Sequence, residues 1–221
     1  MKRAFTLVEV MCVTATIAIV AAMAMPAFSK ARNKATAGAC LSNQRQLGQA
    51  FQMFLMENKH TLPNSTVKPE GKGWLAGTIV PNALSDNNVV YSLDGGLIFS
   101  QVEEKGIFRC EATPDDKPVS FSMNQVLSGR KVSGIRKPTD APLLLEELTN
   151  DDGNFTLVNY YLTEQGTLGV KSSYIPSRNN TLGNRHNGHD NVLFLDFHAN
   201  AVNWSTEECW LECLRVDYKG K

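Results

Sequence analysis

The sequence predicts an α+β protein in which one long N-terminal helix packs on an antiparallel sheet and a short helix ends the chain. An uncharged apolar run covers residues 10–28, and residues 29–57 extend it without a proline. Beyond residue 60, short runs of β-branched and aromatic residues alternate with turn-forming residues. A chain of 221 residues has room for one such head and one helical stem.

The apolar run is long enough to cross a membrane. Residues 10–28 span about 28 Å as a helix at ~1.5 Å per residue, close to the roughly 30 Å hydrocarbon core of a bilayer. A secretory signal peptide has a shorter apolar region, about 7 to 15 residues, and then a cleavage site. Because helix-compatible sequence follows instead, we expect one helix that is half in lipid, with a bend near Pro26, which lacks a backbone donor.

The outer half of this helix is predicted to lie against the head. Steps of three and four residues place its apolar side chains on one face: Cys40, Leu47, Phe51, Phe54 and Leu55. Residues 29–60 are therefore expected to form an amphipathic continuation of the membrane helix.

Six runs in the head are strand candidates by their β-branched and aromatic content. They are residues 89–93, 119–126, 143–148, 155–162, 192–197 and 199–204. Residues 97–105 fit either a strand or a short helix, and both alternatives stay open. The final helix is marked by Ser205 and by Glu208 three positions later, which together form a capping box.

The charge balance argues against a nucleic-acid-binding protein, because 22 basic residues face 22 acidic ones. These charges are unevenly placed along the chain. Up to Met56 stand six of the basic residues and one acid, Glu9, so a mildly basic stem precedes an acidic head. No nucleic-acid partner is therefore expected.

Glu9 is the unusual residue at the edge of the apolar run, because a carboxylate near lipid is costly unless it has a partner. In the simplest interpretation it lies at the membrane interface as part of the flank. In the alternative, the chain is cut between Ala4 and Phe5. The new amino group would then lie one helical turn from Glu9, on the same chain or on an identical neighbour.

Residues 2–10, Lys-Arg-Ala-Phe-Thr-Leu-Val-Glu-Val, resemble the prepilin leader of type IV pilins and type II secretion pseudopilins. The shared features are a short basic leader, a small residue before the cut, a phenylalanine after it, a glutamate four residues on and a proline late in the apolar helix. The family usually has glycine in place of Ala4. The resemblance implies cleavage after Ala4 by prepilin peptidase, methylation of the Phe5 amino group, and lateral packing of helices into a filament in which Glu9 keeps the register.

The resemblance also implies how the chain is organised. Residues 1–4 are then the leader, 5–28 the transmembrane and assembly helix, 29–60 its continuation and 61–221 a pilin-like head. The N-terminus would lie in the cytoplasm, the helix would cross the inner membrane once, and the head would face the periplasm or the exterior. Expected partners are prepilin peptidase, like or related pilin subunits, the secretion or pilus assembly machinery and the membrane.

A second resemblance extends along nearly the whole chain, to prepilin-like proteins abundant in planctomycete-type bacteria. Their C-terminal signature is a histidine, nine residues, and then Asp-Gly. The matching pieces are residues 34–35, 40–44, 47–48, 107–110 and 184–186, together with Asp196. Nine residues separate His186 from Asp196, but Phe197 stands in place of the glycine. The turn that this glycine supports is therefore expected to be built differently.

Five cysteines occur in the chain. Cys12 lies inside the apolar run, where a thiol packs as a small hydrophobe. An exported head permits disulfides, and the other four cysteines allow three pairings. Cys40 with Cys110 is favoured, because this bond would tie the stem to the sheet and close a loop of about 70 residues. Cys209 and Cys213, one helical turn apart, are either two buried thiols or bonded to each other or to the first two.

Three histidines and two aspartates near the C-terminus form a candidate site for a divalent metal. Their nitrogen and oxygen donors suit zinc or a similar ion: His186, His189, Asp190, Asp196 and His198. The alternative needs no ligand, because His186 and Asp196 would hydrogen-bond across a loop and organise a hairpin. The paired acids at 146–147 and 151–152 are interpreted as solvated residues beside a turn. No hydrolase signature such as His-Glu-x-x-His is present, and no other cofactor is expected.

These observations favour a structural, non-enzymatic subunit, a prepilin-like membrane protein whose helix assembles with others. A second hypothesis keeps the membrane anchor and makes the head a binding module for glycan, metal or secreted cargo, with an exposed site near Trp74, His186, His189 and His198. A third, a tethered metal-dependent hydrolase, requires the five histidine and aspartate side chains to lie within metal-binding distance of one another.

Overall fold

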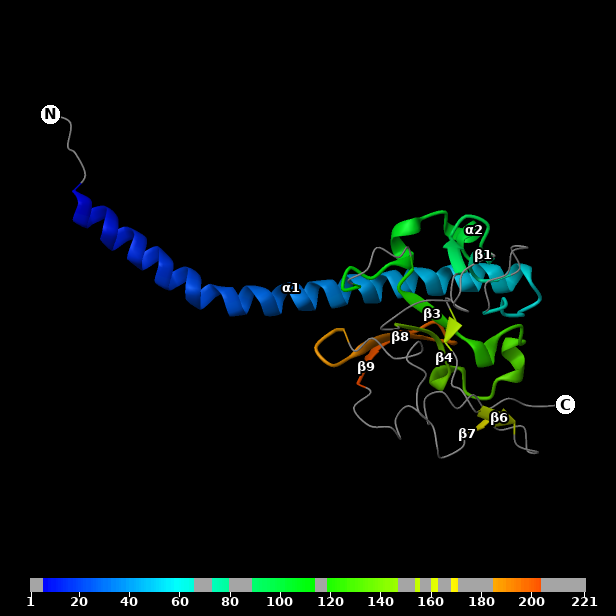
Figure 1. Ribbon diagram of the computed structural model, residues 1–221. Coiled ribbons are helices and arrows are strands. Elements are labelled where there is room, and N and C mark those ends of the chain that lie inside the picture. Colours follow the sequence, from blue (N-terminus) through cyan, green and yellow to red (C-terminus); the bar gives the residue numbers. More distant parts are fainter. Residues whose placement is uncertain are drawn as a thin grey trace.

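The computed structural model describes residues 6–65, 73–79, 89–113, 119–146, 154–155, 160–162, 168–170 and 185–203. A long helix runs beside a head built of short strands and helices, which is the α+β arrangement that the sequence predicts (Figure 1). The C-terminal helix expected after residue 204 lies outside the described residues.

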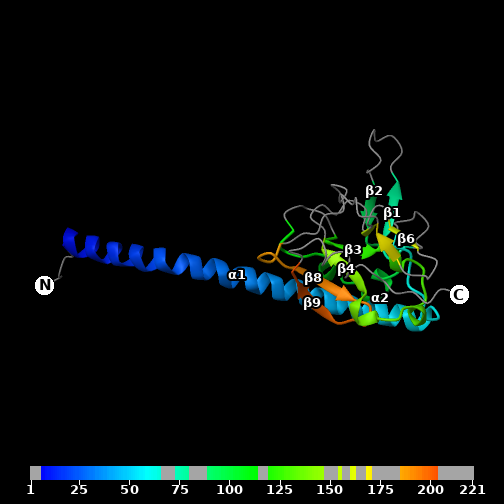
Figure 2. The same cartoon turned by 90° about the horizontal axis from the view of Figure 1, so that it is seen from below.

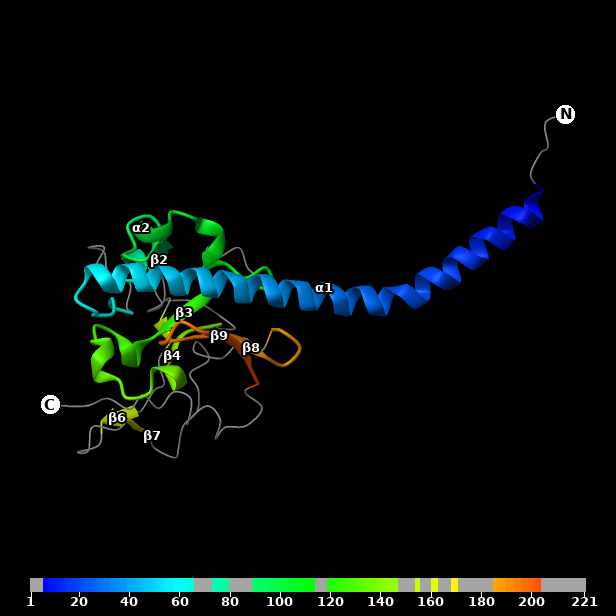
Figure 3. The same ribbon diagram turned by 180° about the vertical axis from the view of Figure 1, so that it is seen from behind.

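The long helix, α1 (Leu7–Glu57), has 51 residues, and at ~1.5 Å per residue it is about 77 Å long. Thr6 caps its first turn through a capping box with Glu9. The helix remains continuous through Pro26 and bends in its N-terminal half (Figure 1, Figure 3). A proline removes one backbone donor and crowds the preceding turn, which is the physical reason the bend was expected.

The N-terminal half of α1 has no buried residue. Residues 6–35 are exposed on every side of the helix, and this half projects away from the head (Figure 2). Large apolar side chains are exposed along it: Leu7, Val8, Val10, Met11, Val13, Ile17, Ile19, Val20, Met23, Met25 and Phe28. Within the described part of the chain, α1 is the helix that is long and apolar enough to cross a membrane.

The C-terminal half of α1 packs on the head through the face predicted from its spacing. The predicted members of this face are all buried: Cys40, Leu47, Phe51, Phe54 and Leu55. The same face also buries Gln44, Gly48 and Ala50. A Cβ at Gly48 would lie 3.1 Å from Leu193 Cδ1, so glycine lets the helix approach the sheet closely.

The central sheet has the strand order β5-β3-β4-β8-β9. Its strands are β3 (Phe121–Asn124), β4 (Pro142–Glu146), β5 (Asn154–Phe155), β8 (Asp190–Phe194) and β9 (Ala199–Val202). Neighbouring strands are antiparallel except β5, which pairs parallel with β3 at the edge. Strands β8 and β9 contact α1 (Figure 2). The late strand β8 therefore lies between β4 and β9 and also against the stem.

Smaller elements surround this sheet. Two hairpins pair β1 (Ala76–Ile79) with β2 (Val89–Ser92) and β6 (Tyr160–Leu162) with β7 (Leu168–Val170). The short helices are α2 (Phe99–Val102) and the 3-10 helices η1 (Lys105–Phe108), η2 (Gln125–Leu127), η3 (Val132–Gly134) and η4 (Pro138–Asp140).

The predicted strands are found in place, although their ends differ. The runs at 89–93, 119–126, 143–148, 192–197 and 199–204 overlap β2, β3, β4, β8 and β9. The run at 155–162 overlaps β5 and β6, and residues 156–159 lie outside the described part. Residues 97–105 include the helix α2, so the helical alternative is the correct one there. The ends differ because backbone pairing, not apolar content, determines where a strand stops.

Aromatic rings fill the space between α1 and the head. The indole of Trp74 is fully buried and stacks between Phe51 and Phe108, at centroid distances of 6.3 and 6.4 Å. Phe99 lies 6.1 Å from Phe108 in a tilted arrangement. The core of the head therefore includes a stem side chain as one of its central members.

The β8–β9 turn contains the position at which the resembling family has glycine. Phe197 there has a φ of 71°, in the left-handed region that non-glycine residues enter at a cost of about 1–2 kcal/mol. Its N–H donates to Phe194 O at 2.9 Å, and its partly buried side chain packs on the core. The turn thus keeps a backbone conformation that glycine favours, contrary to the expectation of a different construction.

Candidate functional site at the stem and head junction

A disulfide joins the stem helix to the head. Cys40 of α1 and Cys110, which follows η1, are bonded with their Cα atoms 5.0 Å apart. Both residues are buried. This is the pairing favoured from the sequence, and its sequence separation is 70 residues. Cys209 and Cys213 lie outside the described residues, and Cys12 is an exposed free cysteine.

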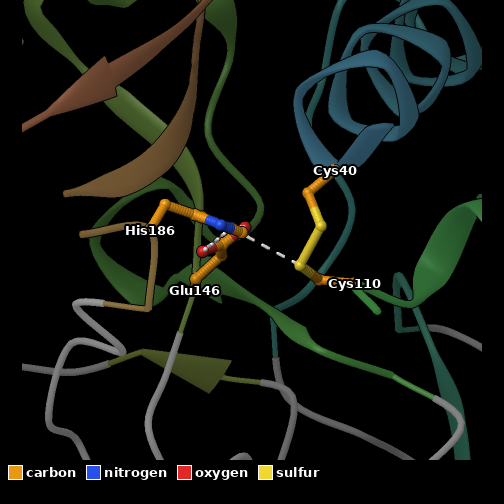
Figure 4. A group of neighbouring side chains, drawn as sticks. All are labelled: Cys40, Cys110, Glu146 and His186. Atoms are coloured by element: carbon orange, nitrogen blue, oxygen red, sulfur yellow. Dashed lines mark hydrogen bonds and ion pairs between the residues drawn. A yellow bond between two sulfur atoms is a disulfide. The ribbon is translucent and has the colours of Figure 1, made fainter. Parts of the chain in front are cut away.

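Two ionisable side chains meet at this disulfide (Figure 4). His186 Nε2 lies 3.5 Å from Cys110 Sγ and 3.2 Å from Glu146 Oε1. His186 and Glu146 are thus a hydrogen-bonded pair in contact with the disulfide. Glu146 is fully buried and His186 nearly so. We name the four residues Cys40, Cys110, Glu146 and His186 the junction cluster.

Local structure explains how Glu146 and His186 reach the same point. Glu146 is the last residue of β4, a strand whose five residues are all buried. His186 stands in a tight turn before β8, in which its N–H donates to His189 O and the N–H of His189 donates to His186 O. Asn187 and Gly188 in this turn have φ values of 56° and 88°, in the left-handed region that asparagine and glycine tolerate best. Because β4 pairs with β8, the two side chains meet.

A second layer of polar groups supports the junction cluster. Asn191 Nδ2 donates to Glu146 Oε1 at 3.4 Å and to Ala37 O of the stem at 3.2 Å. Gln44 Nε2 donates to Asn191 O at 2.8 Å. The other carboxylate oxygen, Glu146 Oε2, is buried and lies 3.2 Å from His186 Nε2 without hydrogen-bonding geometry to any described residue. This oxygen therefore has a close contact with the imidazole but no hydrogen bond from a described residue.

An open pocket of about 340 Å³ reaches the cluster from the outside. Its lining combines stem and head residues: Ser29, Arg32, Thr36, Glu111, Arg185 and His186. The pocket lies where the stem leaves the head, and its residues are mostly polar. Water and small solutes can therefore approach His186 although the rest of the cluster is covered.

The junction cluster is also a group of potential metal ligands. Its two Sγ atoms, one imidazole nitrogen and one carboxylate oxygen all lie within 4.8 Å of one another. Among the described residues, no other group of three or more potential metal ligands comes together. It shares only His186 with the set of residues predicted from the sequence.

That predicted set is dispersed. His186 and Asp196 stand at opposite ends of β8, a strand of about 16 Å at ~3.3 Å per residue. The alternative in which these two residues hydrogen-bond across a loop is therefore wrong. Asp196 pairs instead with His198 Nδ1 in the β8–β9 turn. His189 is partly exposed before β8, and Asp190 is buried within it.

Two further expectations are corrected by burial. Trp74 is fully enclosed by the core and lines no exposed binding site, whereas His186 is nearly buried but does line the open pocket at the junction. Glu146 is not a solvated acid beside a turn, because β4 extends to it and both faces of β4 are covered. The signal that was missed is its position directly after three leucines at 143–145.

At the other end of the stem, Glu9 is bonded within its own chain. Its Oε2 accepts from Thr6 N–H at 2.8 Å and from Thr6 Oγ1 at 2.9 Å, and Thr6 Oγ1 accepts from Glu9 N–H at 3.3 Å. The sequence signals this capping box by threonine followed three positions later by glutamate. Ala4 and Phe5 lie outside the described residues, so cleavage and the amine partner of Glu9 stay predictions.

Comparison with protein-family models, with curated proteins and with solved structures finds no match to this chain. Functional inference therefore depends on its own residues and their geometry.

Proposed function

We propose that this chain is a structural, prepilin-like membrane subunit, cleaved between Ala4 and Phe5 and assembled into a type IV pilus-like or type II secretion pseudopilus filament. The observation that carries the proposal is the N-terminal half of α1. It is apolar over residues 10–28, exposed around its whole circumference, and continuous with a stem that is bonded to a folded head.

The exposed apolar surface of this helix must be buried against lipid or protein. An apolar helix exposed on all sides is stable in lipid or against other apolar helices, and not in water. Its polar side chains also suit lipid, because Thr14 and Thr16 donate their hydroxyls to the carbonyls of Val10 and Cys12, each at 3.1 Å. Lipid covers the helix before assembly, and neighbouring subunits cover it in the filament.

The attachment of the stem to the head suits a subunit that transmits force to its neighbours. Besides the disulfide, Asn43 Nδ2 donates to Arg109 O at 2.9 Å and Gln44 Nε2 donates to Asn191 O at 2.8 Å. These bonds connect α1 to two different segments of the head. A filament subunit requires such a connection, since its helix is held by neighbours while its head bears external load.

In this proposal the N-terminus is cytoplasmic, the helix crosses the inner membrane once, and the head lies in the periplasm or outside. The partners are prepilin peptidase, like or related subunits and the assembly machinery, and the chain itself performs no catalysis. The hydrolase alternative needed a five-residue metal group, which does not form among the described residues. The binding-module alternative needed an exposed aromatic or histidine-lined site; Trp74 is buried, and of the histidines considered His186 lines the open pocket.

The proposal is tested by the mass and N-terminal sequence of the protein isolated from membranes. With prepilin peptidase present, we expect the chain to begin at Phe5 and to carry a methyl group on its amino terminus. Without the peptidase, the chain should begin at Met1. Full-length chain in cells that process other prepilins would contradict the proposal.

Glu9→Gln is expected to leave membrane insertion unchanged and to reduce filament assembly strongly. Glutamine keeps an oxygen that can accept from Thr6 but removes the charge that would meet the amino group of Phe5. Thr6→Ala is the matched control, because it disrupts the capping box and leaves the charge. Membrane fractionation and the yield of sheared filaments measure the two effects. Normal assembly of Glu9→Gln would remove the ionic role.

A further inference from the structure

We propose that the junction cluster is a Zn²⁺ site when its disulfide is open, with Cys40, Cys110, His186 and Glu146 as the four ligands. The proposal goes beyond the filament function and does not depend on it. It begins from the convergence of two sulfurs, one imidazole nitrogen and one carboxylate oxygen within 4.8 Å, all from buried residues. These donors come from the stem, the segment after η1, β4 and the turn before β8.

The ligand-to-ligand distances that involve His186 already match those around a tetrahedral Zn²⁺ ion, and these contacts require no covalent bond to break. A tetrahedral ion with Zn–S of ~2.3 Å and Zn–N and Zn–O of ~2.0 Å has S···N edges of about 3.5 Å and N···O edges of about 3.3 Å. The observed separations are 3.5 Å from His186 Nε2 to Cys110 Sγ and 3.2 Å from His186 Nε2 to Glu146 Oε2. The main change needed is separation of the two sulfurs to about 3.8 Å once they are no longer bonded.

The donor set selects zinc by its chemistry. Two thiolates, an imidazole and a carboxylate are ligands that Zn²⁺ accepts in four-coordinate sites, whereas magnesium and calcium favour oxygen alone. The buried oxygen Glu146 Oε2, which has no hydrogen bond from a described residue, supplies a lone pair for the metal. Asn191 Nδ2 donates to the other oxygen, Glu146 Oε1, at 3.4 Å. This hydrogen bond would orient the carboxylate toward the metal without Asn191 itself being a ligand.

A route to the site exists. The pocket of about 340 Å³ at the stem and head junction is lined by His186 and by Glu111, the residue after Cys110. A hydrated ion or a small reductant can therefore reach the edge of the cluster without unfolding of the head. Such a route is one of the requirements for a metal site inside a folded protein.

The disulfide and the metal exclude each other, because both use the same sulfur atoms. A trialkylphosphine opens the disulfide by attack on one sulfur, and hydrolysis then releases the phosphine oxide and two thiols, so that phosphorus is oxidised and the sulfurs are reduced by two electrons. Binding of Zn²⁺ passes the two thiol protons to the buffer, and His186 binds the ion through an unprotonated Nε2 while Nδ1 carries the ring proton. A newly made chain, whose cysteines are still thiols, needs no reductant.

The test uses the full-length chain in detergent, reduced with a trialkylphosphine under anaerobic conditions and titrated with Co²⁺ as a spectroscopic substitute for Zn²⁺. We expect one equivalent to bind, with thiolate-to-cobalt charge-transfer absorption and the strong visible bands of a tetrahedral ion, and Zn²⁺ to displace it. The oxidised chain should bind no Co²⁺ at this site and should show neither the charge-transfer absorption nor the tetrahedral visible bands. Absence of these bands in the reduced wild-type chain would overturn the proposal.

Variants assign the ligands. Glu146→Gln and His186→Ala should each weaken Co²⁺ binding at least as much as the roughly 10–100-fold that changes around a metal site cost. The combined variant Cys40→Ala, Cys110→Ala retains Cys209 and Cys213 and should lose the charge-transfer band. His198→Ala, at an exposed histidine outside the cluster, is the control and should bind as wild type does. A band that survives in the double cysteine variant would place the metal elsewhere and overturn the proposal.

A measurement on the wild-type chain covers the case in which a variant fails to fold. X-ray absorption of the reduced, Zn²⁺-loaded chain should give two sulfur and two nitrogen or oxygen ligands at the distances stated above. Four sulfur ligands, or none, would exclude the junction cluster as the site.

Discussion

Replacing both Cys40 and Cys110 by alanine is expected to lower the free energy of unfolding of the head by about 4 kcal/mol. The bond joins residues 70 apart in sequence, and closing a loop of that length restricts the denatured chain much more than the native one. Alanine at both positions avoids a free thiol or an unpaired hydroxyl in the buried cluster. Denaturant titration of the full-length chain in detergent, followed by tryptophan fluorescence, measures the change.

The control for this variant is Cys12→Ala. Cys12 is exposed in the apolar half of α1 and is not bonded, so its removal should leave unfolding of the head unchanged. A double variant that unfolds within about 0.5 kcal/mol of wild type, the range of neutral surface substitutions, would contradict the prediction. It would mean that packing alone holds the stem against the sheet.

The stem was predictable because its information is local. Nineteen uncharged residues followed by a three- and four-residue apolar spacing specify a long helix and the face that it buries. The structure buries that face from Cys40 to Leu55. Gln44 on the same face was not predicted, because its burial depends on a carbonyl acceptor at Asn191, 147 residues further along the chain.

Within the junction cluster the Cys40–Cys110 bond was predicted, but the contact of Glu146 with His186 beside it was not, because nothing local encodes that contact. Glu146 and His186 are 40 residues apart, and they meet because β8 pairs with β4 on one side as well as with its sequence neighbour β9 on the other. The spacing between His186 and Asp196 suggested a contact across a loop. A five-residue strand lies between them instead. The same spacing therefore separates the two side chains along a strand and does not bring them together across a loop.

Trp74→Ala is expected to destabilise the head by about 3–5 kcal/mol, the usual cost of truncating a fully buried tryptophan. The indole is completely enclosed and stacks on Phe51 of the stem and Phe108 of the head. Trp74→Phe keeps one ring of this stack and should lose less. Since the variant removes a fluorophore, proteolysis across a urea series is the suitable measurement.

Met56→Ala is the control, since Met56 belongs to α1, the helix on which Trp74 packs, but is 76% exposed and should change stability by no more than about 0.5 kcal/mol. An exposed ligand-binding role for Trp74 predicts the reverse pattern, with binding lost and stability retained. A Trp74→Ala chain as stable as wild type would therefore contradict its place in the core.

Trp74 and the disulfide stabilise the same junction, so their losses should not add. Phe108, which stacks on Trp74, is two residues before Cys110, and Phe51 lies on the same helix as Cys40. Contacting or linked residues show coupling energies of about 0.5–3 kcal/mol in double-mutant cycles. We expect the combined variant to lose less stability than the sum of the separate losses, because loosening the stem by either change already weakens the contacts that the other removes. Strictly additive losses would show that the aromatic stack and the disulfide fix the stem independently.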